Sequence, residues 1–374
     1  MKKYIAVDFY DLIWQQSTPF SLADMEELFL KYAETGIDAV LWRLSACGKL
    51  LYHTKTQDLY AGCASQGDLG PKALAVMAAY DPAEAAVALG KKYGIEVYFW
   101  LTVYDESSYS TSPELESSLC AAHPEYSWRT KDGSEFYRGV LSYTYPEVVE
   151  FKLRQIREIA AYGGAGLYLC NRSHSRSAVV RKAMLAAKDV EKDAAAWCRE
   201  YRELLVSEFK RCRGMFGYDP PALASFHGDL NDTAAWQRHR GTYFTAFLEQ
   251  AKAAVQPGKL LFGLRYGANS GPYIYGDHFF DWERFSDGSL LDALAYDLQP
   301  PHYDDPALFP EFYRETQGKK LLWMSLSARE PEKLLEAYAE SLERWKPHMD
   351  GIILFEAYQM TNNPPYWEFI RNFR

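Results

Sequence analysis

The sequence predicts an α/β protein of the (β/α)₈ class, the TIM barrel, with long βα loops and a single domain over residues 1–374. Eight short β-rich runs alternate with helical patterns, which is typical of βαβ units and a parallel sheet. The length of 374 residues exceeds the roughly 250 of a typical barrel but suits one with long loops, although two ordinary domains would also fit. No G-x-G-x-x-G segment or P-loop occurs, which disfavours the alternative of a doubly wound open sheet.

Each strand is expected where a short apolar run is bounded by turn or helix signals. The eight runs cover residues 4–9, 37–44, 96–103, 166–171, 260–265, 291–298, 321–326 and 351–356. Helices with clear end signals connect the first four runs. They are expected from Ser21 to Gly36, from Asp81-Pro82 to Gly94, and from Tyr145-Pro146 to Gly163-Gly164.

A long segment separates the fourth run from the fifth, and we expect an extended helical insertion there, at about residues 189–255. Its two helical patterns cover residues 189–213 and 232–255. The short apolar segment 222–226 resembles a strand, but Pro220-Pro221 and Gly228 bracket it too closely for that interpretation.

The composition, with 48% hydrophobic and 24% charged residues, is that of a soluble globular protein. The net charge of −9 argues against a nucleic-acid partner, which normally requires a basic face. No segment approaches the roughly 20 apolar residues of a membrane span, so no membrane partner is expected. The N-terminus leads directly into the first strand rather than into an apolar signal segment. We therefore expect a cytoplasmic location, or export with the leader already removed.

No cofactor or metal is expected. The six cysteines are scattered without a C-x-x-C pair, so neither a zinc site nor a disulfide framework follows. His-x-His and His-Glu-x-x-His spacings are also absent from the sequence.

In a barrel the active site lies at the carboxyl ends of the strands, so the polar residues at those ends are the candidates. In strand order they are Asp8, Arg43, Asp105, Asn171, Arg172, His174, Arg265, Tyr266, Asp297, Glu356 and Tyr358.

Two carboxyl groups usually hydrolyse a glycosidic bond, one as an acid and one as a nucleophile or base. Glu356 is the leading candidate for the acid, because it follows an apolar run that would raise its pKa. Asp297 and Asp105 are the candidates for its partner, with Asp8 a weaker one. Three of them have a structural alternative: Glu356 could pair with an arginine, Asp105 could be an N-cap or loop residue, and Asp8 could position a basic side chain.

The three strand-end arginines, Arg43, Arg172 and Arg265, indicate either an anionic substrate or a network that orients the catalytic acids. His174 could transfer protons or simply hydrogen-bond within its loop. Aromatic residues make up 16% of the chain, and flat amphipathic rings suit the faces of sugars as well as protein cores. Loop tryptophans are the expected sugar contacts, namely Trp14, Trp128 and Trp282, whereas mid-strand Trp100 and Trp323 suit the core.

Several motifs together resemble the bacterial glycosyl-hydrolase-like family ten barrels. They are His123-Pro124-Glu125, Asp132-Gly133, Leu141–Val148, Gly166–Leu169, Phe216–Pro220, Trp236–Gly241 and Tyr243–Leu248. The resemblance covers most of residues 1–300 and implies a TIM barrel with a carbohydrate substrate. In the better-known branch strand four ends in acidic residues, whereas here it ends in Asn171-Arg172-Ser173-His174.

Three functions are compatible with these observations. The first is a glycoside hydrolase that uses Glu356 with Asp297 or Asp105. The second is a lyase or another non-hydrolytic sugar enzyme, with His174 or a tyrosine as base and the arginines holding a uronic acid. The third is a catalytically inactive carbohydrate-binding barrel, suggested by the missing acid on strand four.

Overall fold

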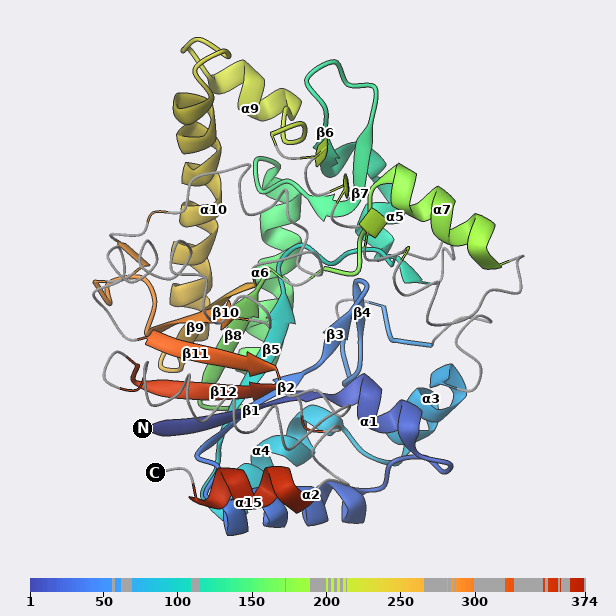
Figure 1. Ribbon diagram of the computed structural model, residues 1–374, viewed down its shortest axis with the longest axis vertical. Coiled ribbons are helices and arrows are strands. Elements are labelled where there is room, and N and C mark those ends of the chain that lie inside the picture. Colours follow the sequence, from blue (N-terminus) through green and yellow to red (C-terminus); the bar gives the residue numbers. More distant parts are fainter. Residues whose placement is uncertain are drawn as a thin grey trace.

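The computed structural model contains a closed barrel of eight parallel strands, in the order β1-β12-β11-β10-β9-β8-β5-β2 (Figure 1). It describes residues 1–55, 58–61, 69–108, 115–171, 173–188, 200, 203–204, 207–208, 211–212, 214–265, 281, 284–285, 287–298, 320–325, 346, 349–355, 357 and 364–372. The (β/α)₈ fold predicted from the sequence is confirmed.

All eight barrel strands coincide with the predicted runs. Their bounds are β1 Lys2–Asp8, β2 Ala39–Arg43, β5 Glu96–Thr102, β8 Gly166–Cys170, β9 Lys259–Arg265, β10 Ala293–Leu298, β11 Lys320–Ser325 and β12 Gly351–Phe355. Each strand pairs in parallel with both neighbours, and the pairing of β1 with both β2 and β12 closes the sheet.

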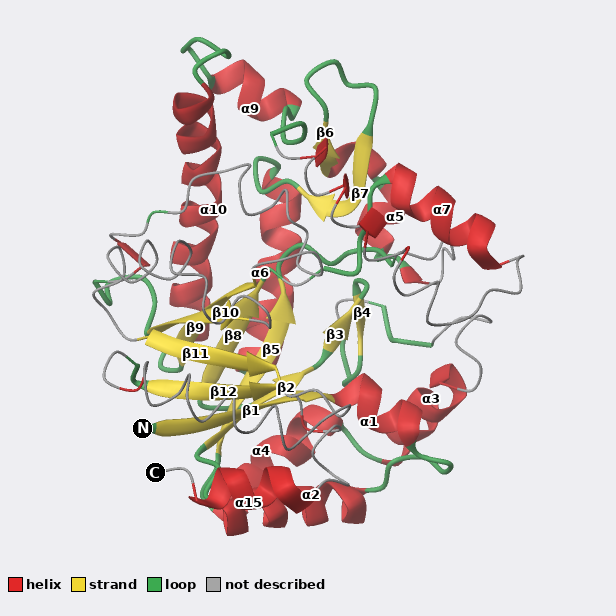
Figure 2. Cartoon of the chain, viewed as in Figure 1, coloured by secondary structure: helices red, strands yellow, loops and turns green. Residues whose placement is uncertain are grey.

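Helices surround the strands (Figure 2). Those that follow the predicted signals are α2 (Leu22–Thr35), α4 (Pro82–Tyr93) and α6 (Pro146–Ala160). Ser21 and Asp24 form a reciprocal capping box at the start of α2, which satisfies backbone N–H groups that the helix leaves without partners. The helices α1 (Phe9–Gln15) and α3 (Leu69–Ala79) were not predicted. The last helix, α15 (Pro364–Asn372), packs against α2.

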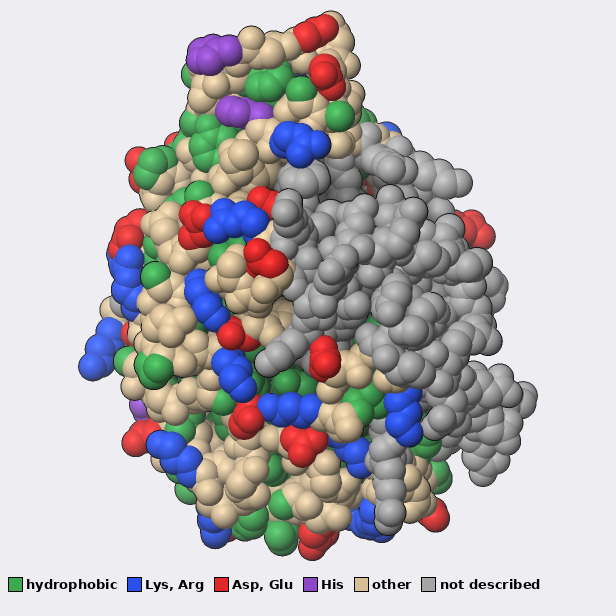
Figure 3. Space-filling view, turned by 90° about the vertical axis from the view of Figure 1, so that its left-hand side faces the viewer, with side chains coloured by type: hydrophobic (Ala, Val, Ile, Leu, Met, Phe, Trp, Pro, Cys, Tyr) green, Lys and Arg blue, Asp and Glu red, His purple; other side chains and the backbone are tan. Residues whose placement is uncertain are grey.

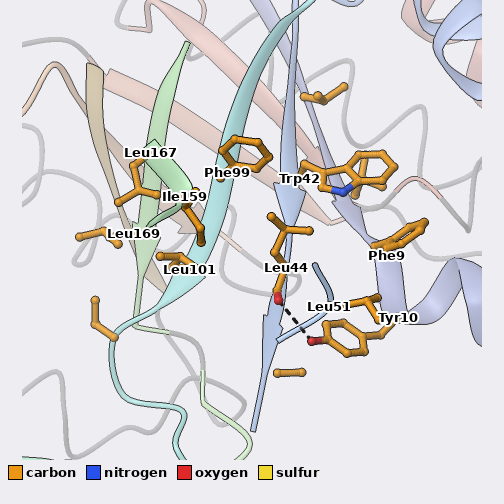
Figure 4. Close-up of a cluster of buried hydrophobic side chains, with 14 of the residues drawn as sticks. Phe9, Tyr10, Trp42, Leu44, Leu51, Phe99, Leu101, Ile159, Leu167 and Leu169 are labelled. Carbon is orange, nitrogen blue, oxygen red and sulfur yellow. Dashed lines mark hydrogen bonds between the residues drawn. The ribbon is translucent and has the colours of Figure 1, made fainter. Parts of the chain in front are cut away.

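Alternation along the strands separates two apolar layers. Side chains such as Ala6, Leu41 and Trp100 fill the barrel interior. Their neighbours in sequence point outward and pack under the helices, for example Trp42 and Phe99. Figure 4 shows this outer layer, in which Ile159 of α6 lies beside Leu101 and Leu167 of the strands. The period of two therefore determines which strand-end residues reach the inside of the barrel.

The segments after β2, β5 and β8 build a layer above the carboxyl ends of these strands (Figure 1). After β2 comes the hairpin β3 (Ser45–Ala46) and β4 (Lys49–Leu50). After β5 come α5 (Ser118–Ala122) and the hairpin β6 (Ser127–Arg129) and β7 (Phe136–Leu141). The short 3₁₀ helix 124–126 leads into that hairpin.

The segment after β8 contains α7 (Ala178–Lys188), α9 (Pro220–Ser225) and α10 (Thr233–Val255). The apolar stretch 222–226 lies largely in α9, as its exclusion from the strands anticipated. The first helical pattern, 189–213, lies mostly outside the described residues. The second corresponds to α10, which packs against α6 and β9 and so occupies the position of a barrel helix while also extending beyond the sheet (Figure 1).

Within the described residues, no one helix has the length and apolar character of a membrane span. The pair α3 and α4, bent by 61°, meets those criteria only when its two helices are taken together.

The turn between β3 and β4 has backbone angles that favour glycine. Cys47 and Gly48 have φ values of 52° and 71°, as in a two-residue type I′ turn. A Cβ on Gly48 would lie 2.6 Å from Ser117 Cβ and 2.9 Å from Glu106 Oε2. Gly133 shares the positive φ of 71°, but no atom lies within 4 Å of its Cβ position. An alanine at Gly133 would therefore introduce backbone strain alone, whereas an alanine at Gly48 would introduce both strain and crowding.

We predict that Gly133→Ala lowers the free energy of unfolding by about 1–2 kcal/mol, the cost of a left-handed backbone for a residue with a Cβ. Gly48→Ala should lower it by a further ~1–3 kcal/mol, because the added methyl group overpacks the loop above the barrel. Urea denaturation of both variants measures the difference. Equal losses would show that the crowding around Gly48 has no energetic consequence.

Candidate functional site at the barrel mouth

The inward-facing series of β1 and β2 ends in charged residues. Tyr4 and Ala6 line the interior, and Asp8 is the next residue of that alternation; in β2, Leu41 is followed in the same way by Arg43. The register pairs Asp8 directly with Arg43. The sequence thus places a carboxylate and a guanidinium side by side at the carboxyl end of the barrel.

Arg43 is buried, with 1% of its surface exposed, and three of its nitrogens are engaged. Nη1 donates to Asp8 Oδ2 at 2.5 Å, Nε donates to the carbonyl of Ser45 at 2.8 Å, and Nη2 donates to Asp105 Oδ2 at 3.3 Å. The guanidinium carbon also lies 5.2 Å from the centre of the Trp100 ring, within cation–π range. Although burial opposes the charge, the two carboxylates raise the pKa of Arg43 above its ordinary value.

Asp105 lies three residues beyond β5, and its side chain is fully buried. Its Oδ1 accepts the backbone N–H of His174 at 2.6 Å, and its Oδ2 accepts the backbone N–H of Cys47 at 3.1 Å. Oδ2 also lies 2.9 Å from His174 Nδ1. Burial alone would raise the pKa of Asp105, but the charge and hydrogen bond of His174, followed by the charge of Arg43, hold it well below its ordinary value.

Asp8, Arg43, Asp105 and His174, from the ends of β1, β2, β5 and β8, are called the mouth network below. His174 is the member that reaches solvent, with 23% of its side chain exposed. Its loop is fixed from below, since Ser173 Oγ donates to the carbonyl of Tyr104 at 2.6 Å and Ser175 Oγ donates to that of Ser107 at 3.0 Å.

Cys47, Asp105 and His174 bring three potential metal-ligand atoms within 4.8 Å of one another. The Arg43 guanidinium, however, lies 3.3 Å from Asp105 Oδ2 and 3.4 Å from His174 Nδ1. Its positive charge would repel a divalent cation at this point. Burial, as the largest cause, also raises the pKa of the Cys47 thiol well above its ordinary value, whereas a metal ligand must be a thiolate.

A second buried ion pair supports the same loops. Lys152 of α6 binds Glu106 Oε1 and donates to the carbonyl of Thr102 at 3.1 Å. Gly48 and Ser117 pack beside the other oxygen of Glu106. This pair fixes the chain immediately after Asp105 to the helix layer and gives the mouth network a rigid base.

The remaining predicted site residues fall into three groups. Asn171 is fully buried at the end of β8, and its N–H donates to the carbonyl of Gly263. Trp14, expected in a loop, lies in α1 with 61% of its surface exposed, a geometry compatible with a stacking platform. Arg265 and Asp297 are described only as strand backbone. Outside the described residues lie Arg172, Tyr266, Trp282, Glu356 and Tyr358.

Trp128 was also expected in a loop, and that expectation is wrong. It lies in β6 and is buried, because the guanidinium of Arg240 covers its ring at 4.4 Å and Tyr104 packs against its edge at 5.5 Å. A sugar ring cannot stack on a face that the protein already covers.

Sequence reasoning missed the residues that hold the network in place, namely Ser45, Cys47, Ser173 and Ser175. They act largely through backbone groups or single hydroxyls. Gly48, which lies between two short apolar runs, was the available sequence signal for a turn above the mouth.

The surface in Figure 3 carries lysines and arginines interspersed with acidic residues. On this side of α10 a cavity of about 310 Å³ is lined by residues of both signs, including Arg238, Glu249, Asp281 and Arg284. Arg284 and Glu249 form an ion pair at 2.6 Å, so the cavity's charges are partly matched internally.

We predict that Asp8→Ala lowers the free energy of unfolding by about 3–5 kcal/mol, because it leaves the buried charge of Arg43 undercompensated. Adding Arg43→Met should recover part of the loss, since both charges are then gone. Glu150→Ala, which removes an exposed ion pair with Arg157 of comparable length, should change stability by no more than about 1 kcal/mol. Similar losses from the buried and exposed pairs in chemical denaturation would contradict this account.

A pH dependence follows from Asp105. Its folded-state pKa lies below the value of about 3.9 expected in the unfolded chain, so its ionisation stabilises the fold above that pH. This contribution is lost as the pH falls below about 4 towards the folded-state pKa. The stability advantage of wild type over Asp105→Asn, measured by denaturation at pH 5 and at pH 3, should therefore be smaller at pH 3. An advantage that is constant down to pH 3 would show that Asp105 is not the titrating group.

No sequence-family model and no curated protein matches the chain. Among solved structures, the β-galactosidase of Bacillus circulans sp. alkalophilus is similar with a TM-score of 0.52 and 10% identity, over 95% of this chain and 50% of that one. The β-galactosidase of the psychrophilic Marinomonas ef1 gives 0.47 and 14%, over 95% and 54%. A psychrophilic family 10 endo-β-1,4-xylanase gives 0.48 and 12%, over 100% and 97%. The chain spans about half the length of the two galactosidases, and at 10% identity the likeness to the Bacillus enzyme concerns the fold alone.

Proposed function

We propose that the protein is a glycoside hydrolase acting on an oligo- or polysaccharide, with Glu356 and Asp297 as its carboxyl pair. The observation that carries the proposal is the mouth network itself. Four charged or titratable side chains converge from the ends of neighbouring strands at the carboxyl end of a closed barrel, where barrel enzymes hold their active sites.

The positions of the two carboxyl residues along the chain support their assignment. Asp297 is the penultimate residue of β10, and its backbone pairs with Arg265 of β9. Glu356 directly follows Phe355, the last residue of β12. Asp297 therefore continues the inward series of Ala293 and Ala295 at the edge that carries the mouth network, Glu356 is the first residue after β12 in the sequence, and glycoside hydrolysis needs two carboxyl groups.

Asp105 suits a supporting role better than that of proton donor. Both of its oxygens accept hydrogen bonds, and its lowered pKa keeps it ionised at neutral pH. Arg43 is similarly engaged, with Asp8, Asp105 and Ser45 as partners. In the proposed enzyme, recognition of any anionic group on the substrate would thus depend on Arg172 and Arg265.

The similarity to a β-galactosidase, a barrel enzyme named for glycoside cleavage, adds support for a sugar substrate. Trp14, in the helix α1 that follows β1, is 61% exposed, and an exposed indole suits the face of a sugar ring. A second candidate, a lyase acting on an anionic sugar, is favoured by one observation, the partly exposed imidazole of His174 beside an ionised carboxylate.

We predict that the wild-type protein releases reducing ends from one or more members of a plant, algal and host glycan panel. Glu356→Gln and Asp297→Asn should each lower the rate at least about 100-fold, because each removes a group that transfers a proton or stabilises charge in the transition state. Glu368→Gln on the outer surface of α15 is the matched control and should retain full activity.

Absorbance of unsaturated products, read in the same assay, separates the two reactions. Unsaturated product without new saturated reducing ends would replace hydrolysis by the lyase reaction. Activity unchanged in both carboxyl variants would remove Glu356 and Asp297 from the mechanism.

A further inference from the structure

The protonation state of His174 follows from its contacts. Asp105 is ionised, so its oxygens can only accept, and Oδ2 lies 2.9 Å from His174 Nδ1. Nδ1 must therefore carry the proton. Arg43 Nη2 also lies near Nδ1, but at 3.4 Å, and Asp8 at 2.5 Å already balances its charge. The carboxylate is thus the stronger determinant of the tautomer.

The backbone around His174 is held as firmly as its ring. Its own N–H binds Asp105 Oδ1 at 2.6 Å, so one carboxylate fixes both the main chain and the imidazole. Arg176 is buried and donates from Nη1 to the carbonyls of Ser173 and Ser175, each at 2.8 Å. Hydrogen bonds therefore fix the loop on both sides of His174. Such positioning is typical of a functional side chain, and a histidine that only meets solvent does not need it.

When Nδ1 carries the proton and faces Asp105, the lone pair of a neutral imidazole lies on Nε2, at the opposite edge of the ring. The ring is 23% exposed, whereas Asp105 behind it is fully buried. We propose that His174 is a proton-transfer residue of the barrel mouth, with Nε2 as the accepting atom and Asp105 as its positioning residue. The assignment rests on the proposed function for its substrate and extends that function by naming a base.

In hydrolysis, Nε2 takes a proton from a water molecule. The water oxygen forms the new bond to the anomeric carbon while the glycosidic C–O bond breaks, and Glu356 donates its proton to the departing oxygen. Asp297, the second carboxyl group of the proposed pair, stabilises the positive charge that develops at the anomeric carbon. The resulting imidazolium keeps its Nδ1–H on Asp105, then loses the Nε2 proton to solvent, while the Glu356 carboxylate is reprotonated from solvent.

The charged groups around the imidazole are compatible with this cycle. Asp105 and Asp8 supply two negative charges, and Arg43 and Arg176 supply two positive ones. The nearby Cys47 thiol stays neutral because burial raises its pKa. Among the residues that the structure describes, these two pairs of opposite charges therefore balance around His174.

The tautomer can be tested without any substrate. Protein labelled with ¹⁵N-histidine is examined by long-range ¹H–¹⁵N correlation, with His174→Gln to assign the signal. We expect protonated Nδ1 and unprotonated Nε2 at neutral pH, and a shift towards protonated Nε2 in Asp105→Asn. His123 contacts Glu125 at 3.0 Å with both side chains exposed, so Glu125→Gln is the matched control for a pair that solvent screens. Finding Nε2–H in the wild type overturns the proposal whether or not a substrate is known.

Zinc chloride, added alone to the same sample, distinguishes a metal site. We expect the His174 signals to be unchanged at one equivalent. A stoichiometric shift of these signals that is lost in Cys47→Ala would instead make Cys47, Asp105 and His174 metal ligands and would overturn the proton-transfer role.

Kinetics on the glycan identified by the screen provide the second test. His174→Gln should lower kcat about 100-fold or more and remove the acidic limb of the pH profile, with KM changed by less than about threefold. Asp105→Asn should lower kcat by at least about tenfold, because the base remains but loses its fixed tautomer. Glu125→Gln should match wild type. A raised KM with unchanged kcat in His174→Gln would make His174 a binding residue and end the proposal, while leaving hydrolysis by Glu356 and Asp297 intact.

Discussion

The barrel mouth is organised by the need to bury the charge of Arg43. A guanidinium with 1% exposure is tolerable only when its nitrogens find partners, and here these come from three segments: Asp8 of β1, the carbonyl of Ser45 in the hairpin, and Asp105 beyond β5. Asp105 in turn fixes Cys47 and His174. One buried cation therefore sets the relative positions of the loops after four strands, and the exposed imidazole is held at the end of that chain of contacts.

Much of the architecture could be predicted from the sequence because it depends on long, repeated patterns. The eight strands and the helices after Ser21, Asp81 and Tyr145 all have a period, a cap or a terminating glycine. The elements that were missed lack such signals. α1 begins directly after β1 with no turn between them, and β3 and β4 are two residues long, too short to show alternation. The packing of α10 on α6 and β9 could not be read from its helical period alone.

The sequence predicted which residues lie at the strand ends of the candidate site, but not which of these residues contact one another. Strand ends correctly marked Asp8, Arg43, Asp105 and His174 as residues of one edge, since parallel strands end together. Which oxygen meets which nitrogen depends on loop geometry between residues 69 positions apart, as for Asp105 and His174, and no local pattern encodes it. Trp128 illustrates the same limit: its strand forms by pairing with β7, and its ring is covered by a tertiary contact with Arg240 of α10.

The long sequence separations within the mouth network have a consequence for how the chain folds. Asp8 and Arg43 meet as soon as the first two strands pair, but the second carboxylate arrives only with β5 and the imidazole only with β8. In an intermediate without β5 and β8, the guanidinium of Arg43 would lack Asp105 and would need water as a partner. Such an intermediate could not exclude water from the carboxyl end of its strands. We therefore expect water to leave the barrel mouth only when the first half of the barrel is complete. We also expect a local opening of these four strands to readmit water at the site.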